Sequence, residues 1–137
     1  MDAIDEILPA LQAKAAERGY DALSHAERVV LDVTEVEAQV NNGGFDQFFY
    51  NRSGDRAQER IAALEEIGAQ ETAALLKLAC GRFPGKAPSA EWFVRQKQLL
   101  EDVADEAFDD LDARFFADPD GMSKRLVAYW GKHKPKR

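Results

Sequence analysis

Apolar residues recur at helical spacing along most of this chain, and this periodicity limits the folds it can adopt more than any other feature. The clearest case is a stripe of four valines at successive steps of four, three and four residues: Val29, Val33, Val36 and Val40. Such steps place side chains on one face of a helix, whereas a half-buried strand alternates every second residue. Ser24 and Glu27 have the spacing of a capping box, which predicts that this helix begins directly after Ser24.

Similar spacing over most of the remaining chain predicts an all-α fold. We expect a single compact helical domain over residues 1–131, with about six or seven helices around one core. A basic, frayed tail is expected over 132–137. The stretch 90–117 is predicted to be one long helix, and strand is expected at most as a minor element near 45–50. A chain of 137 residues is long enough for one hydrophobic core.

The charge of the chain is unevenly distributed. It has 18 basic and 25 acidic residues, for a net charge of −7. Residues 124–137 hold six of the basic residues and no acid, so residues 1–123 have a net charge of −13. A body this acidic repels nucleic acid, because proteins bind DNA by neutralising its phosphates with cationic side chains. We therefore expect no direct contact with nucleic acid, and a basic protein as the suitable partner.

Two further features bear on the compartment. No apolar run approaches the roughly 20 residues of a membrane-spanning helix, so no membrane association is predicted. The sequence has one cysteine, Cys80, and its start lacks the cationic and apolar regions of a signal peptide. These observations favour the reducing cytoplasm.

The least generic segment is 41–55, which is rich in glycine, polar side chains and aromatic rings. One hypothesis is a small-ligand or enzymatic pocket between helices, formed by six polar side chains: Asn41, Asn42, Asp46, Gln47, Tyr50 and Asp55. The alternative is a corner between two helices, in which the glycines allow close backbone approach and the amides satisfy exposed helix ends. The segment is not a phosphate-binding loop, because it lacks the Gly-x-x-x-x-Gly-Lys-Ser/Thr pattern.

A second candidate is the segment 101–120, which contains nine acidic residues and one basic residue. If 101–112 is helical, acids at four-residue steps form two parallel columns, with successive carboxylates about 6 Å apart. Such columns could stand in for a short stretch of DNA backbone, whose phosphates are separated by a comparable distance. The candidate partner-binding face has seven acids: Glu101, Asp102, Asp105, Glu106, Asp109, Asp110 and Asp112. The alternative is a solvated face opposite the apolar residues Val103, Phe108 and Leu111.

The remaining polar residues indicate neither a metal site nor a catalytic one. A smaller acidic group at 32–37 is expected on the exposed side of the valine helix: Asp32, Glu35 and Glu37. Di-metal helical bundles use Glu-x-x-His pairs, and the chain has none. His25 and His133 have no partner at ligand spacing, and no serine–histidine–acid arrangement is visible. We therefore predict no metal, no cofactor and no catalytic residue.

The segment Asn-Asn-Gly-Gly-Phe-Asp-Gln-Phe-Phe-Tyr-Asn-x-Ser-Gly-Asp at 41–55 resembles the signature of the DMP-type DNA-mimic protein family. The resemblance continues through 63–69, 73–83 and 108–116, and it covers most of the chain from about 28 to 130. This bacterial family is all-α, and most of its members are uncharacterised. Its characterised member acts as a mimic of double-stranded DNA that occupies the DNA-binding face of a helix-turn-helix type repressor. The resemblance therefore implies the same class of role for this chain.

The leading functional hypothesis is a non-enzymatic, acidic protein-binding domain that blocks the cationic surface of a DNA-binding protein. A helix-turn-helix protein is the partner class that the resemblance implies. The same features are compatible with a partner subunit or an antitoxin-like component. The sequence does not fix the oligomeric state, and a homodimer is one possibility. We expect the basic tail to be a solvated terminus. The alternatives are that it contacts nucleic acid or membrane, or that it folds back over the acidic helix.

Overall fold

The valine stripe faces the core on α2 (His25–Tyr50), the longest helix of the fold. In the computed structural model, which describes residues 2–136, each of the four valines is at most 3% exposed. The Ser24 hydroxyl accepts a hydrogen bond from the Glu27 N–H at 3.2 Å, and the Glu27 carboxylate accepts one from the Ser24 N–H at 2.8 Å. The predicted capping box is therefore confirmed, and it starts the central helix.

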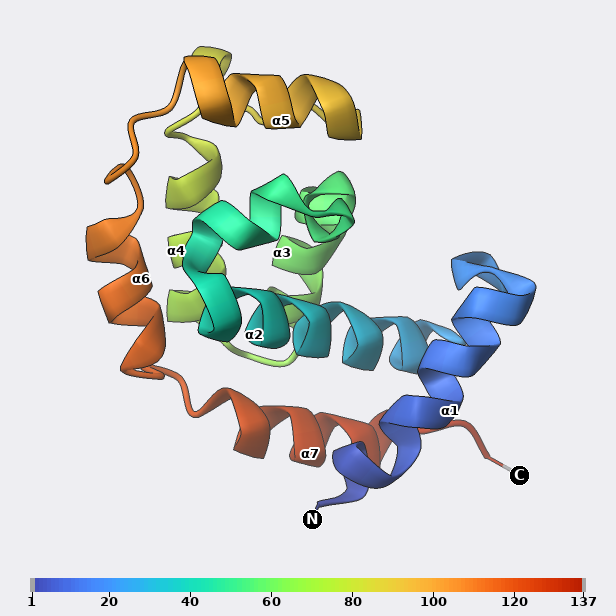
Figure 1. The fold of residues 1–137 in the computed structure, drawn as a ribbon. Helices are drawn as coiled ribbons and strands as arrows, with labels where there is room; N and C mark the ends of the chain where they lie inside the picture. The colour runs from blue at the N-terminus through green and yellow to red at the C-terminus, as the bar shows by residue number, and fades with distance from the viewer. Residues whose placement is uncertain (1, 137) are drawn as a thin grey trace.

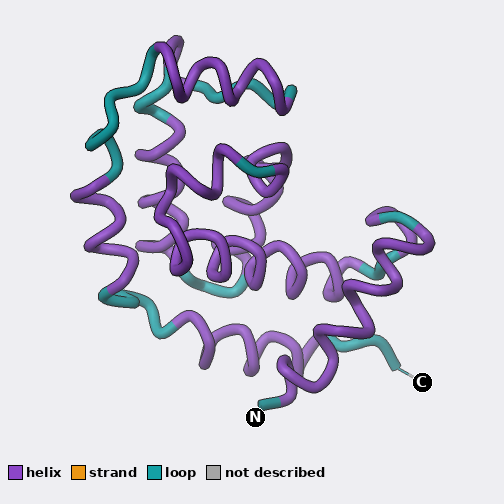
Figure 2. Tube along the Cα trace, in the orientation of Figure 1, coloured by secondary structure: helices purple, strands orange, loops and turns teal. Residues whose placement is uncertain are grey.

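Six further α-helices surround α2 within residues 2–136 (Figure 1). In chain order they are α1 (Ala3–Arg18), α3 (Ala57–Glu66), α4 (Gln70–Cys80), α5 (Trp92–Glu101), α6 (Asp109–Phe116) and α7 (Met122–His133). Helix α2 contacts α1, α3, α5, α6 and α7, and α4 packs against α3 and α6. The described part of the chain contains no strand (Figure 2), so the all-α prediction is confirmed. Residues 45–50, the one place where a minor strand was allowed, are helical.

Helix α2 bends sharply at a double glycine. Gly43 (φ −151°, ψ 20°) and Gly44 (φ 73°, ψ −177°) leave the helical conformation, and residues 45–50 resume it in a new direction. The positive φ of Gly44 lies in a region that residues with side chains rarely adopt. The corner between two helical segments, one of the two hypotheses for 41–55, is thus present at this double glycine.

The restarted part of α2 presents three aromatic rings to the core: Phe45, Phe48 and Phe49. The Phe49 ring lies 4.8 Å from that of Phe83 and 5.7 Å from that of Phe108, measured between centroids. The Phe45 ring lies 5.7 Å from that of Phe115 on α6. These rings fix which side of residues 45–50 faces inward, and Asp46 is consequently exposed.

The chain leaves the helical conformation between α5 and α6, so the prediction of one helix over 90–117 is wrong. Leu99 and Phe108 are both buried. At about 100° per residue, their separation would place them on opposite sides of a continuous helix, about 180° apart. The turn at 102–108 lets both side chains reach the same core. It also removes like-charged pairs at four-residue steps, which destabilise a helix.

The basic C-terminal residues lie beside α1. Helix α7 ends at His133, inside the segment expected as a frayed tail. Lys134 and Lys136 line a groove together with Ile7 and Lys14 of α1. This part of the chain is at the end of the molecule away from α5 and α6 (Figure 1). The described tail residues therefore do not fold back over the acidic segment.

Candidate acidic interface

The side chain of Asp112, on α6, caps the restarted part of α2. Its Oδ1 accepts a hydrogen bond from the Phe45 N–H at 2.8 Å, which satisfies a backbone donor at the start of that helical segment. Gly44 lies directly against the same carboxylate, because a Cβ added there would be 2.4 Å from Asp112 Oδ2. The double glycine and Asp112 therefore form one structural unit, although the sequence analysis assigned them to two separate candidate sites.

The amide side chains of the 41–55 corner bond to one another and to Gln39, which precedes the corner on α2. Asn42 Nδ2 donates to Gln47 Oε1 at 3.1 Å, and Gln47 Nε2 donates to Gln39 Oε1 at 3.0 Å. Asn51 Nδ2 donates to the same Gln39 oxygen at 2.9 Å. These bonds leave fewer polar groups with which the corner could bind a ligand.

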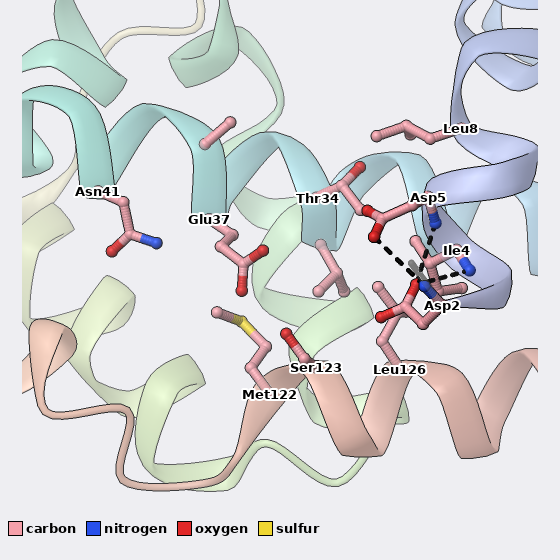
Figure 3. Close-up of a pocket in the computed structure, with 12 residues that line it drawn as sticks. Asp2, Ile4, Asp5, Leu8, Thr34, Glu37, Asn41, Met122, Ser123 and Leu126 are labelled. Carbon is pink, nitrogen blue, oxygen red and sulfur yellow. Dashed lines mark hydrogen bonds between the residues drawn. The ribbon is translucent and has the colours of Figure 1, made fainter.

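The other four candidate pocket residues point in different directions. Asn41 lines a separate cavity between α1, α2 and α7 (Figure 3). Asp46 is exposed and lies near the turn between α5 and α6. Tyr50 is exposed, and Asp55 forms an ion pair with Arg95, with 2.7 Å between Oδ1 and Nη2. The structure thus places the six polar side chains of the corner in several distinct surroundings.

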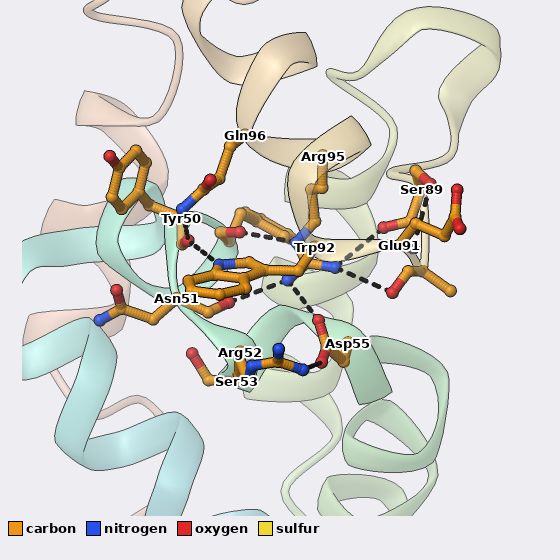
Figure 4. A network of polar contacts seen from close by, with 12 residues as sticks. Tyr50, Asn51, Arg52, Ser53, Asp55, Ser89, Glu91, Trp92, Arg95 and Gln96 are labelled. Carbon is orange, nitrogen blue, oxygen red and sulfur yellow. Dashed lines mark hydrogen bonds and ion pairs between the residues drawn. The ribbon is translucent and has the colours of Figure 1, made fainter.

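A buried arginine that the sequence analysis missed explains the Asn-Arg-Ser-Gly-Asp part of the corner (Figure 4). Arg95, on α5, is 0% exposed. It donates to the carbonyls of Phe49 at 2.6 Å and Asn51 at 2.9 Å. A Cβ added to Gly54 would be 2.6 Å from Arg95 Nε, so glycine is what lets the guanidinium approach. With Asp55 as its anionic partner, this arginine satisfies carbonyls at the C-terminal end of α2.

The spacing of α5 contained a signal for this contact. Arg95 lies four residues before Leu99 and three after Trp92, on the inward side of the helix, where an apolar residue is expected. The indole Nε1 of Trp92 donates to the Tyr50 carbonyl at 2.8 Å, beside the guanidinium. A charged residue at an inward position requires buried partners. Here they include carbonyls at the C-terminal end of α2, the Ser89 carbonyl and the Asp55 carboxylate.

Asp32 is buried, so the expectation that it is exposed is wrong. It is 2% exposed, and its carboxylate accepts hydrogen bonds from the Tyr20 hydroxyl at 2.5 Å and from Arg60 Nε at 3.3 Å. Burial raises the pKa of Asp32 despite these bonds. Its position, three residues after Val29 and four before Val36, belongs to the inward side of α2. This acid is part of the core and is not available to a partner.

The six acids between 101 and 110 are all exposed, but they do not form columns. Glu101 is the last residue of α5, three acids lie in the following turn, and two begin α6. The three in the turn are Asp102, Asp105 and Glu106, and the two on α6 are Asp109 and Asp110. Because the helix is interrupted, the expected rows of carboxylates at four-residue steps are absent.

Tertiary packing instead brings four acids from three segments close together. These residues, which we call the acidic quartet, are Asp46 on α2, Asp105 in the turn, and Asp109 and Asp112 on α6. Burial and the charge of Asp105 raise the pKa of Asp46. Burial, with the charges of Asp109 and Asp46, raises the pKa of Asp112 although the Phe45 N–H bond opposes it. Within residues 2–136, no member of the quartet forms an ion pair with a basic side chain.

Asp110 differs from its neighbours because Arg82 neutralises it. Arg82 Nη2 lies 2.9 Å from Asp110 Oδ2, and this hydrogen bond holds the pKa of Asp110 at about 2. The guanidinium also donates to the carbonyl of Ala107. Both charged side chains are largely solvated, so the pair adds little stability. Its effect is to leave Asp110 less available to an external cation than the acids of the quartet.

The chemistry of the site is that of an anionic surface. Within residues 2–136, no group of three or more His, Cys, Asp or Glu side chains is placed to hold a metal ion. In the same residues, no helix combines the length and the apolar character needed to cross a membrane. Burial raises the pKa of the Cys80 thiol to about 11, so its nucleophilic thiolate is scarce at neutral pH.

These features define an all-helical protein with a kinked central helix and an acidic surface assembled from several segments. A family model described as DMP19-like protein matches residues 21–133. The chain therefore belongs to the DMP19-like protein family, as the resemblance of the 41–55 segment implied. No curated protein and no solved structure matches the chain. Several signature residues of 41–55, among them Gly44 and Gly54, have structural roles in the kink and in the contact with Arg95.

Proposed function

We propose that this protein is a non-enzymatic, acidic binding domain that occupies the DNA-binding surface of a cationic protein, as a mimic of double-stranded DNA. The observation that carries the proposal is the acidic quartet, in which carboxylates from three segments gather and pair with no basic side chain of residues 2–136. Three further exposed acids lie at the end of α5 and in the turn that follows: Glu101, Asp102 and Glu106.

The energetics of the quartet favour a cationic partner. Carboxylates that approach one another disfavour each other's charged form, and the raised pKa values of Asp46 and Asp112 express this repulsion together with burial. A cationic protein surface would relieve the repulsion, and the net negative charge would speed the encounter. If these acids served only to keep the surface solvated, acids spread over the surface would serve equally well.

Regular columns of carboxylates are not needed for this role. Phosphates position a DNA-binding protein through charge, and base edges supply the sequence information. An anionic surface that spans a turn and two helices can therefore compete for the same arginine and lysine side chains. We propose a helix-turn-helix regulator in the cytoplasm as the partner, because the family resemblance implies that class. Whether the domain acts as a monomer or as a homodimer does not alter the proposal.

The alternative function, a small-ligand or enzymatic site at 41–55, has less support. The amides of Asn42, Gln47 and Asn51 are engaged in hydrogen bonds with one another or with Gln39. Asp55 is neutralised by Arg95. These contacts assign most of the polar groups in the corner to the fold. We therefore propose no catalytic role and no cofactor for them.

The test is capture of a partner that competes with DNA. Immobilised wild type and a variant with Asp46, Asp105 and Asp109 all changed to asparagine are incubated with host lysate, and bound proteins are eluted with a salt gradient. The proposal predicts that the wild type retains a DNA-binding protein that the variant does not. Elution should require only moderate salt, because exposed charges are screened over about 8–10 Å at physiological ionic strength.

A matched control removes the same number of charges elsewhere. Glu17, Glu59 and Glu71 are exposed acids on α1, α3 and α4, and changing them to glutamine should leave capture intact. Duplex DNA added to the captured complex should release the partner. Equal retention by both variants, or a partner that binds this protein and DNA at the same time, would contradict the proposal.

A further inference from the structure

A cavity of about 230 Å³ lies between α1, α2 and α7 (Figure 3). Its apolar wall is formed by five side chains: Ile4, Leu8, Val33, Met122 and Leu126. This volume is below the roughly 300 Å³ at which pockets for drug-sized ligands begin. The cavity therefore suits a small molecule or a single side chain of another protein.

The charged groups of this cavity all have the same sign. Asp2, Asp5 and Glu37 contribute carboxylates, and no basic side chain is among the described residues that line it. Asp2 Oδ1 accepts hydrogen bonds from the N–H groups of Ile4 and Asp5 at 2.9 and 3.0 Å, which holds this carboxylate in place. The Thr34 hydroxyl donates to a carbonyl of its own helix at 2.8 Å, so towards the cavity its oxygen can only accept.

Glu37 has the least favourable surroundings of the three acids. Figure 3 shows its carboxylate between α2 and α7, pointing towards Met122 and Ser123. Burial and the negative charge of Asp118 raise its pKa, while a hydrogen bond with Ser123 opposes the shift. A cation in the cavity would offset both the energetic cost of burying the charged Glu37 carboxylate and its repulsion by Asp118.

The arrangement of the acids indicates which kind of cation fits. No three acidic side chains of residues 2–136 are close enough to hold a metal ion. An ammonium or guanidinium group has several N–H donors and can bond to carboxylates that are farther apart. An aliphatic stem attached to such a group packs well on an apolar wall.

We propose that this cavity binds an alkylammonium or alkylguanidinium group. The group is supplied either by a free small molecule or by a lysine or arginine side chain of a partner protein. The cavity is distinct from the acidic quartet, so this inference does not depend on the proposed DNA mimicry.

The experiment is a calorimetric titration of the full chain with agmatine, an alkylguanidinium compound. Saturable binding is expected, and the Glu37→Gln variant should bind at least tenfold more weakly because it lacks the charge between α2 and α7. Glu35→Gln removes the same charge from the same helix outside the cavity, and it should bind like the wild type. N-butylurea, which has a butyl chain but lacks both the guanidinium and the ammonium group of agmatine, should not bind.

Two further measurements complete the test. Ala38→Leu extends a side chain from an exposed position that lines the cavity, and it should also weaken binding while circular dichroism remains unchanged. A capped Gly-Arg-Gly peptide distinguishes the source: binding at least as tight as that of agmatine indicates a protein side chain, and weaker binding indicates a free small molecule. The inference would be overturned if neither agmatine nor the peptide showed saturable binding. It would also be overturned if agmatine bound the wild type and Glu37→Gln with equal affinity.

Discussion

The carboxylate of Asp112 and the backbone N–H of Phe45 are joined by a 2.8 Å hydrogen bond across 67 positions of the chain. This bond caps the restarted part of α2 and ties α6 to it. It also holds Asp112 near Asp46, where the two charges oppose each other. One contact thus sets both the geometry of the corner and the position of the acidic quartet.

The first prediction concerns this cap. Asp112→Ala should destabilise the protein by about 1–2 kcal/mol, the usual cost of losing a side-chain helix cap. Asp112→Asn keeps an acceptor oxygen and should cost less. Urea unfolding followed by circular dichroism measures both, with Asp109→Ala as an exposed control on the same helix. Equal losses for Asp112→Ala and Asp109→Ala would show that the cap contributes nothing.

The second prediction concerns the buried guanidinium. Arg95→Met should lower the free energy of unfolding by about 3–5 kcal/mol, because it leaves Asp55 and several main-chain carbonyls without their partner. Lys97→Met removes a charge from the exposed side of the same helix and should change stability by less than about 0.5 kcal/mol. If Arg95→Met lowers the free energy of unfolding only slightly, α5 is held in place mainly by its apolar contacts.

The third prediction concerns repulsion within the quartet. Asp105→Asn should lower the pKa of Asp46, because the charge of Asp105 is one of the two causes that raise it. The same variant should be slightly more stable, by up to about 0.5 kcal/mol, while partner capture weakens. Carboxyl carbon chemical shifts followed by NMR over a pH titration report the pKa directly.

Arg82→Gln is the control: it should raise the pKa of Asp110 from about 2 without moving that of Asp46. An unchanged Asp46 pKa in Asp105→Asn would show that the two acids are not coupled.

The fourth prediction is a pH dependence of stability due to Glu37. Its pKa in the folded protein is raised above the ordinary value of 4.5, chiefly by burial, so folding favours the protonated form. This contribution to stability is complete below about pH 4.5 and is lost as the pH rises through the folded-state pKa. Glu37→Gln has no such loss. The variant should therefore gain stability relative to wild type between about pH 4 and pH 7.

The midpoints of urea unfolding, measured for both proteins at about pH 4 and pH 7, give this difference in stability. Glu35→Gln, measured alongside, accounts for the general effect of removing one negative charge from α2. A Glu37→Gln variant whose stability relative to wild type falls as the pH rises would reverse the sign and contradict the assignment.

Local sequence patterns were sufficient for the helical class and for the central helix. The valine stripe and the Ser24–Glu27 capping box depend on residues within a few positions of one another, so their spacing alone predicts the outcome. The glycines of 41–55 likewise favoured a corner between two helices, one of the two hypotheses for that segment. The sequence also singled out acids from two segments of the quartet, since Asp46 and Asp105 were each in a candidate site.

Contacts between distant segments decided the rest. The helix expected over 90–117 breaks because Leu99 and Phe108 cannot both reach one core from a continuous helix. Only packing against Phe49 of α2 and against Phe83 imposes that condition. The burial of Asp32 and Arg95 likewise depends on partners far along the chain.

The sequence by itself therefore determined the helical class, the family and the excess of negative charge. The tertiary structure decided which acids are available to a partner, because availability depends on neighbours in space. Asp112 caps a helix, and Asp110 is neutralised by Arg82. Asp46 lies near Asp105, and neither pairs with a basic side chain in the described part of the chain. Residue spacing cannot distinguish these three cases, since a hydrogen bond or a repulsion between side chains is set by their distance in the folded chain.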